Sequence, residues 1–131
     1  MVISYGTILI LMCLLQVKHM LGDYFLQTRI MLDGRDTYAH LGRFVHAGVH
    51  AAGSALAFIL IGAKIGFILP VILLEWAIHF HIDWWKGRHT SVQNLTPQDA
   101  AYWRVCGMDQ ALHQLTYVVM IWAWIMSDFP T

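Results

Sequence analysis

Four long apolar segments of this chain each carry, near one end, a pair of metal-ligand residue types spaced four positions apart. The pairs are His19/Asp23, His46/His50, His79/Asp83 and Asp109/His113. Residues four apart lie on one face of an α-helix, about 5–6 Å from each other. Ionisable side chains are costly within apolar helices, so their presence there indicates a functional site.

The overall composition predicts a membrane protein. Of 131 residues, 58% are hydrophobic and 12% are charged, whereas soluble domains carry about 25% charged residues. The formal net charge is zero and no basic run is present, which argues against nucleic-acid binding. Cys13 and Cys106 lie far apart and neither belongs to a CxxC motif, which argues against a disulfide or a thiolate zinc site.

Four segments are long enough to cross a bilayer, which takes about 20 residues per helix. We expect these spans at residues 2–27, 43–61, 65–85 and 107–126. The first is interpreted as a membrane helix because it has no basic start and no small-residue cleavage site. A short interfacial helix is expected in the third loop, at Thr96-Pro97-Gln98-Asp99. The expected fold is therefore an all-α polytopic membrane protein, with residues 1–131 forming one four-helix transmembrane bundle.

The basic residues predict the orientation of this bundle. Seven of the eight Lys and Arg residues lie in or beside the first and third loops, and Lys64 lies in the second. By the positive-inside rule, the first and third loops face the cytoplasm and both termini lie outside the inner membrane. All four ligand pairs then fall at one depth near the cytoplasmic face. Sequence order alone does not require this agreement, so it indicates that the pairs converge.

Five imidazoles and three carboxylates form a nitrogen and oxygen ligand set that suits zinc, manganese or iron. Eight donors are too many for one tetrahedral ion, but they suit two divalent ions, which four-helix bundles can hold between inward-facing pairs. The expected ligands are His19, Asp23, His46, His50, His79, Asp83, Asp109 and His113. The three aspartates supply a charge of −3 and are the candidates for a general base.

Four further side chains are expected to support the ligands or to meet a substrate: Gln27, Glu75, Lys86 and Gln110. Lys86 and Arg88 would stand where the site meets the cytosol, and cationic side chains form charge-assisted bonds to phosphate. Histidines 40, 81 and 89 are expected outside the centre, two in loops and one on another helix face.

Four blocks of the sequence carry a family resemblance: His19-Met-Leu-Gly-Asp23-Tyr-Phe-Leu-Gln27, His46-x-x-x-His50, His79-Phe-His-Ile-Asp83-Trp-Trp-Lys86 and Asp109-Gln110-Ala-Leu-His113. These blocks resemble a family of small bacterial and phage membrane proteins catalogued as domain of unknown function 3307. The resemblance covers nearly the whole chain and implies no particular activity. More distantly, the histidine pairs look like those of bacterial inner-membrane proteins labelled as metal-dependent hydrolases.

The favoured expectation is a dinuclear hydrolase that acts at the cytoplasmic face on a phosphate-bearing or acylated amphiphile, with a metal-bound hydroxide as nucleophile. One alternative is a non-enzymatic metal-binding protein in transport or sensing, although the apolar outer halves of the helices argue against a conduit. Another is a metal-free structural or partner-binding protein, in which the same residues form a hydrogen-bond network. Haem ligation is a further alternative, and side-by-side packing of two or more chains stays open.

Overall fold

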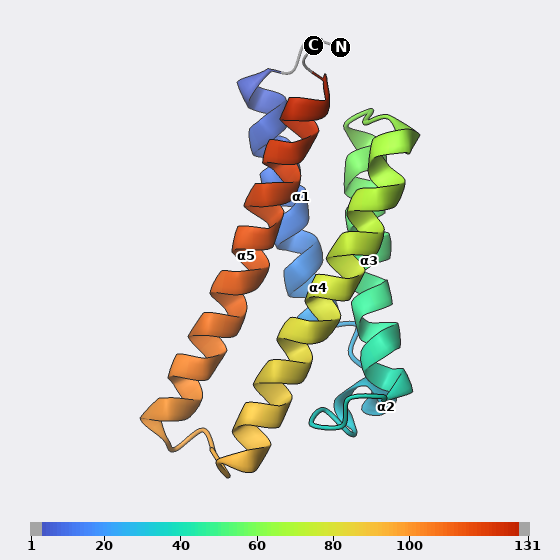
Figure 1. Cartoon of the computed structure of the whole chain (residues 1–131). Coiled ribbons are helices and arrows are strands. Elements are labelled where there is room, and N and C mark those ends of the chain that lie inside the picture. The colour runs from blue at the N-terminus through green and yellow to red at the C-terminus, as the bar shows by residue number, and fades with distance from the viewer. Residues whose placement is uncertain (1–3, 129–131) are drawn as a thin grey trace.

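The computed structural model describes residues 4–128, and within that range the chain is all-α, with no strand (Figure 1). The helices are α1 (Tyr5–Tyr24), α2 (Arg29–Leu32), α3 (Leu41–Leu60), α4 (Ile65–Val92) and α5 (Ala100–Asp128). The four long helices stand side by side, and consecutive ones run in opposite directions. The α3–α4 turn lies at one end of the bundle, while α2 and the α4–α5 turn lie at the other (Figure 1). The all-α prediction is confirmed.

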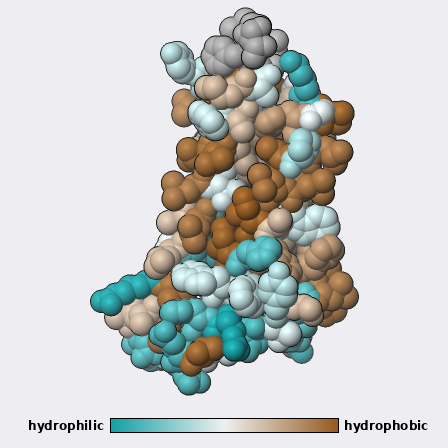
Figure 2. All heavy atoms as spheres, viewed as in Figure 1, coloured by the Kyte–Doolittle hydropathy of each residue, from teal (hydrophilic) through white to brown (hydrophobic). Residues whose placement is uncertain are grey.

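Three of these helices, α1, α3 and α4, are long and apolar enough to cross a membrane. Hydrophobic side chains cover much of the lateral surface, and hydrophilic ones gather at the end that carries α2 and the α4–α5 turn (Figure 2). Leu9, Leu56 and Leu73 are among the large hydrophobic side chains that remain exposed on this surface. A soluble monomer rarely exposes so large an apolar patch, so this surface is compatible with a bilayer.

The third loop is shorter than the sequence predicted, because both flanking helices are longer. Helix α4 continues to Val92 and ends where Asn94 adopts a left-handed conformation (φ 51°). The prediction of a separate interfacial helix in this loop is wrong. The described residues between α4 and α5 form no helix, and α5 runs without a break from Ala100. Just before it, Asp99 accepts hydrogen bonds from the backbone N–H and hydroxyl of Thr96 (2.8 and 2.9 Å), which lower the pKa of its carboxyl group.

A tight turn joins α3 to α4, as its glycines predicted. Gly62 has a φ of 77°, which a residue with a side chain rarely adopts. The backbone N–H groups of Gly62 and Ala63 bond to the carbonyls of Ile59 and Phe58, both at 3.0 Å. This Schellman arrangement satisfies the last carbonyls of α3 and reverses the chain.

The first loop contains the short helix α2, which the sequence did not predict, followed by the expected turn at Gly34. Arg43 of α3 fastens this loop. Its guanidinium donates to the carbonyls of Gly34, Arg35, Thr37 and Tyr38, and the residue is only 4% exposed. Arg43 therefore acts as a structural anchor, although it was interpreted as a loop charge.

The interior of the bundle divides into two halves of opposite character. Towards the α3–α4 turn it is an apolar core formed by Leu11, Leu15, Ala57, Phe58, Ile61, Ile68, Tyr117, Met120, Ile121 and Trp124. Towards the α2 end the buried side chains are polar: His19, Arg43, His46, His50, Ser54, Glu75, His79, Asp109 and His113. The apolar half holds the helices together, and the polar half contains the candidate site.

Candidate metal centre

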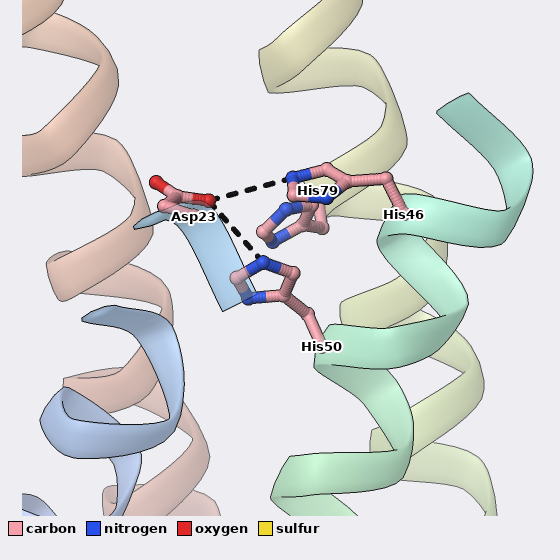
Figure 3. Close-up of side chains that lie close together, drawn as sticks. All are labelled: Asp23, His46, His50 and His79. Carbon is pink, nitrogen blue, oxygen red and sulfur yellow. Dashed lines mark ion pairs between the residues drawn. The ribbon is translucent and has the colours of Figure 1, made fainter. Parts of the chain in front are cut away.

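The eight predicted ligands lie together between the four long helices. Each helix supplies one pair, and the imidazole rings lie close together: His50 stacks on His79 with 4.0 Å between ring centroids, and His113 lies tilted against His79 at 4.2 Å. In Figure 3, Asp23 of α1 faces His46 and His50 of α3, with His79 of α4 beside them. The spacing of four therefore does turn each pair inward.

Asp23 contacts three imidazoles through its two carboxylate oxygens. Its Oδ2 lies 3.2 Å from Nε2 of His19. Its Oδ1 lies 3.4 Å from Nε2 of His46 and 3.2 Å from Nε2 of His50. One carboxylate thus joins helices α1 and α3.

Asp83 occupies an equivalent place on the other side. Its Oδ2 lies 3.3 Å from Nε2 of both His46 and His79, and its Oδ1 accepts or shares a proton with Nε2 of His113 at 3.2 Å. His46 therefore touches both Asp23 and Asp83. The third aspartate, Asp109, has Oδ1 3.5 Å from Nε2 of His113, while its Oδ2 is bound by the Lys86 ammonium at 2.7 Å.

Three overlapping groups of donor atoms could each hold an ion, with all atoms of a group within 4.8 Å of one another. The groups are Asp23/His46/His50/His79, His19/His79/His113 and Asp83/Asp109/His113. His79 and His113 each belong to two groups. Every one of the eight predicted ligands occurs in at least one group.

Several buried polar atoms of the centre lack a hydrogen-bond partner among the described residues. They are Nε2 of His19, Nδ1 of His46, both ring nitrogens of His50 and His79, and Oδ1 of Asp109. His19, His50 and His79 approach a carboxylate in distance, yet their rings are not aligned to bond to it. Buried polar groups are nearly always satisfied, so this cluster of orphaned donors and acceptors fits a site built for cations.

A second polar layer lies directly beneath the imidazoles. The Lys18 ammonium contacts Oε1 of Glu75 (2.6 Å) and the carbonyl of His50 (3.1 Å). The hydroxyl of Ser54 donates to the same Oε1 at 2.8 Å. The Tyr117 hydroxyl lies 2.8 Å from Nδ1 of His19. A hydrogen bond to the second nitrogen fixes the orientation of an imidazole ligand.

The centre opens into a cavity of about 1010 Å³ at the α2 end of the bundle. Asp23 and Asp83 line it with side chains that are 17% and 22% exposed, whereas those of His50 and His79 are at most 2% exposed. A solute that enters the cavity would therefore reach the carboxylates of these two aspartates before it reached His50 or His79. Other lining residues include Tyr24, Gln27, Arg35, Arg43, His46, Lys86, Thr90, Tyr102, Trp103, Cys106 and Gln110.

The four residues expected to support the ligands or to meet a substrate, Gln27, Glu75, Lys86 and Gln110, do not all contact the candidate ligands. Gln110 lies between two aspartates, with its Nε2 3.4 Å from Asp23 and 3.3 Å from Asp109. Lys86 binds Asp109 as described. Gln27 lies beyond the end of α1 and bonds to Arg35 instead of a ligand. Glu75 belongs to the deeper layer.

The residues set aside in the sequence do lie outside the centre. His81 is exposed and contacts Tyr38. His89 stacks on Trp85, and it lies in α4 and not in the expected loop, because α4 continues to Val92. His40 caps α3, with its Nδ1 accepting from the Gly42 N–H. Arg88, which was grouped with Lys86 as a phosphate ligand, is exposed and does not line the cavity.

The sequence interpretation missed Lys18, Tyr117 and Arg35. Tyr117 follows His113 by four residues, so it continues the inward stripe and could have been found by the same rule. Lys18 was counted as a loop charge because it adjoins the end of the first apolar segment. Arg35 lies in an irregular loop, for which no periodicity applies.

Comparison of the sequence with known protein families identifies the family of this chain. The family described as "Protein of unknown function (DUF3307)" matches residues 10–130. The chain belongs to this family. The matched DUF3307 region contains all four candidate ligand pairs, most of α1 and the whole of α2, α3, α4 and α5. No curated protein and no solved structure matches the chain.

Proposed function

We propose that this DUF3307 chain is a metal-dependent membrane hydrolase with a dinuclear centre near the cytoplasmic face, acting on a phosphate-bearing or acylated amphiphile. The observation that carries the proposal is the set of buried imidazole nitrogens that have no hydrogen-bond partner among residues 4–128. Imidazole nitrogens of this kind, grouped with carboxylate oxygens, are ligands for divalent ions such as zinc, manganese or iron.

The donor groups suggest how two ions would be held. One ion would bind Asp23 with His46, His50 and His79, and the other would bind Asp83, Asp109 and His113, which are the first and last of the three groups. His19 would complete the set between them. Paired ions of this type activate water as a nucleophile and stabilise charge on a phosphoryl or carbonyl group.

The exposure of the aspartates supports a division of roles. Asp109 is 1% exposed and is bound by Lys86, so its role would be that of a ligand. Asp23 and Asp83 reach the cavity. Either of these two would serve as the general base, because each can contact both a metal-bound water and a substrate.

The proposal includes four membrane spans. Helix α5 is not among the helices that are apolar enough by composition to cross a membrane, since it carries Gln110 and Gln114 besides its ligand pair. It nevertheless runs along the full length of the bundle (Figure 1). Beyond His113 it exposes Leu115, Val119 and Trp122. These side chains would face lipid, whereas Asp109 and His113 are buried inside the bundle.

Elemental analysis of the full chain in mild detergent tests the proposal. We expect about two divalent ions per chain, and a marked loss in His50→Ala and in Asp83→Asn. His81→Ala is the matched control, because it removes an exposed imidazole of α4 outside the centre. Metal content that is unchanged in both centre variants would remove this model.

One observation favours a metal-free structural role as the second candidate. Asp23 and Asp83 each lie 3.2–3.4 Å from three imidazole nitrogens, which is close enough for direct contact between carboxylate and ring. Proton sharing within such a network could hold the helices together, as polar contacts do in membrane bundles. This candidate predicts no bound metal in the wild-type chain, so the same elemental analysis separates the two.

A further inference from the structure

Three cationic side chains, Arg35, Arg43 and Lys86, line the cavity above the centre. They differ in their hydrogen-bond and ion-pair partners. Arg43 is saturated by loop carbonyls. Lys86 is held by one oxygen of Asp109. The guanidinium of Arg35 donates to the Gln27 amide oxygen at 2.6 Å, and no carboxylate pairs with it in the part of the chain that the structure describes. Arg35 is therefore a positive charge at the cavity mouth that lacks a counter-ion.

The fold places Arg35 next to Lys86, although 50 residues separate them in the sequence. The backbone of Arg35 packs directly on Gly87, where an added Cβ would collide with the Arg35 carbonyl. From the other side, the Arg43 guanidinium binds that same carbonyl. Gly87 and Arg43 thus fix the loop so that Arg35 and Lys86 line one cavity.

The acids of this cavity are engaged by other groups. Asp36 accepts a hydrogen bond from Ser91 at 3.0 Å. Asp23 and Asp83 are turned towards the imidazoles. In the proposed function two divalent ions, with a charge of about +4, would more than balance the −3 of the three ligand aspartates. The cavity would then be electropositive.

We propose that Arg35 and Lys86 bind the phosphate group of the substrate and hold it over the centre, with Gln27 orienting the Arg35 guanidinium. Guanidinium and ammonium groups form short charge-assisted bonds to phosphate oxygens. The inference rests on the proposed function for the reaction at the ions, and it selects the phosphate-bearing substrate class over the acylated one. Tyr102 and Trp103, which also line the cavity, would meet the less polar remainder of the molecule.

Calorimetric titration of the metal-loaded full chain with inorganic phosphate tests this site. Because bonds to charged groups contribute strongly, Arg35→Gln should raise the dissociation constant about tenfold or more, while metal content stays at the wild-type level. Lys86→Gln should also weaken phosphate binding. Arg88→Gln is the matched control, since it removes a neighbouring charge that does not line the cavity, and it should bind phosphate as the wild type does.

The outcomes separate this inference from the proposed function. If the wild type holds metal but Arg35→Gln binds phosphate normally, or if Arg88→Gln weakens binding equally, the phosphate site is overturned and the metal centre stands. If the wild type binds no phosphate, the site is overturned as well. A wild-type chain without metal refutes the proposed function, and weaker phosphate binding by Arg35→Gln in that chain still supports the site.

A second arm identifies the source of the phosphate. The chain is reconstituted in phosphatidylcholine vesicles with or without a minor fraction of phosphatidic acid, and phosphate binding is measured again. Competition by phosphatidic acid assigns the site to a lipid phosphate monoester. Unchanged binding assigns it to a water-soluble phosphate ester, and either result retains the Arg35 site.

Discussion

Lys18 and Glu75 form an ion pair at a depth where the bundle is otherwise becoming apolar. Their side chains are 11% and 1% exposed. The imidazoles lie above the pair, and the Tyr117 ring lies beside it, with its centroid 4.5 Å from the Lys18 ammonium. Charged groups at such sites require a partner, because burial removes their hydration. Because Lys18 also donates to the His50 carbonyl, the pair links α1, α3 and α4 at this level.

Removing one member of this pair should be more harmful than removing both. Glu75→Leu leaves the Lys18 ammonium buried without its carboxylate, which we expect to reduce the free energy of unfolding by about 3–5 kcal/mol. The double variant Lys18→Met/Glu75→Leu should recover much of that loss, because no buried charge remains. Thermal unfolding in detergent measures both. A double variant no more stable than Glu75→Leu would show that the charges do not compensate each other.

Individual residues were predictable where one rule applied. The convergence of the eight candidate ligands and the inward position of Glu75 follow from spacing by four within apolar segments, and Tyr117 and Ser54 obey the same rule. Gln27 does not continue the helical stripe, because α1 ends at Tyr24, but it lines the cavity from the loop and bonds to Arg35. Arg35 could not be predicted from the sequence, since its position depends on contacts with Gly87 and Arg43 from two other segments.

At the scale of the elements, the close approach of α1 and α3 depends on Gly22. A Cβ added at Gly22 would collide with the imidazole ring of His50. The absence of a side chain lets the His50 ring lie against α1 and approach Asp23, with 3.2 Å between Nε2 and Oδ1. The packing of two helices and the geometry of the centre are therefore set by the same residue.

Gly22→Ala should displace His50 and lower the metal content or metal affinity of the chain while its helix content is retained. Gly107→Ala is the control, because a Cβ there meets nothing within 4 Å, and alanine is favoured over glycine in a helix by about 1 kcal/mol. Elemental analysis with circular dichroism makes the comparison. Equal metal content in the two variants would contradict the role assigned to Gly22.

The ends of the elements were the least predictable part of the fold. Hydropathy marks only the apolar part of a helix. Helix α4 continues beyond its apolar part, through a mostly polar stretch, to Val92. It ends there because the backbone N–H groups of Asn94 and Leu95 bond to the last carbonyls of the helix. Likewise α5 includes Ala100 to Cys106, which lie before its apolar part. Both extensions leave the apolar band and form walls of the cavity, so the sequence predicted the centre better than its entrance.

At the scale of the whole molecule, the division into an apolar half and a polar half supports a defined orientation in the membrane. The polar half carries α2, the cavity and the basic residues Arg35 and Lys86 (Figures 1 and 2). Arg43 is buried and the side chain of Lys18 is only 11% exposed, so the positive-inside argument rests on the other basic residues. Arg29, Arg35, Lys86, Arg88 and Arg104 still lie at this end, which we propose faces the cytoplasm.

Cys106 provides the test of this orientation, because it lines the cavity and is partly exposed. A membrane-impermeant thiol reagent should label it only after the cytoplasmic side has been opened. Cys13 lies on the outer surface of α1, where lipid would shield it, so labelling should disappear in Cys106→Ser. Labelling of Cys106 in intact cells would reverse the orientation: the centre and its cavity would open outside the membrane, and the substrate would have to come from that side.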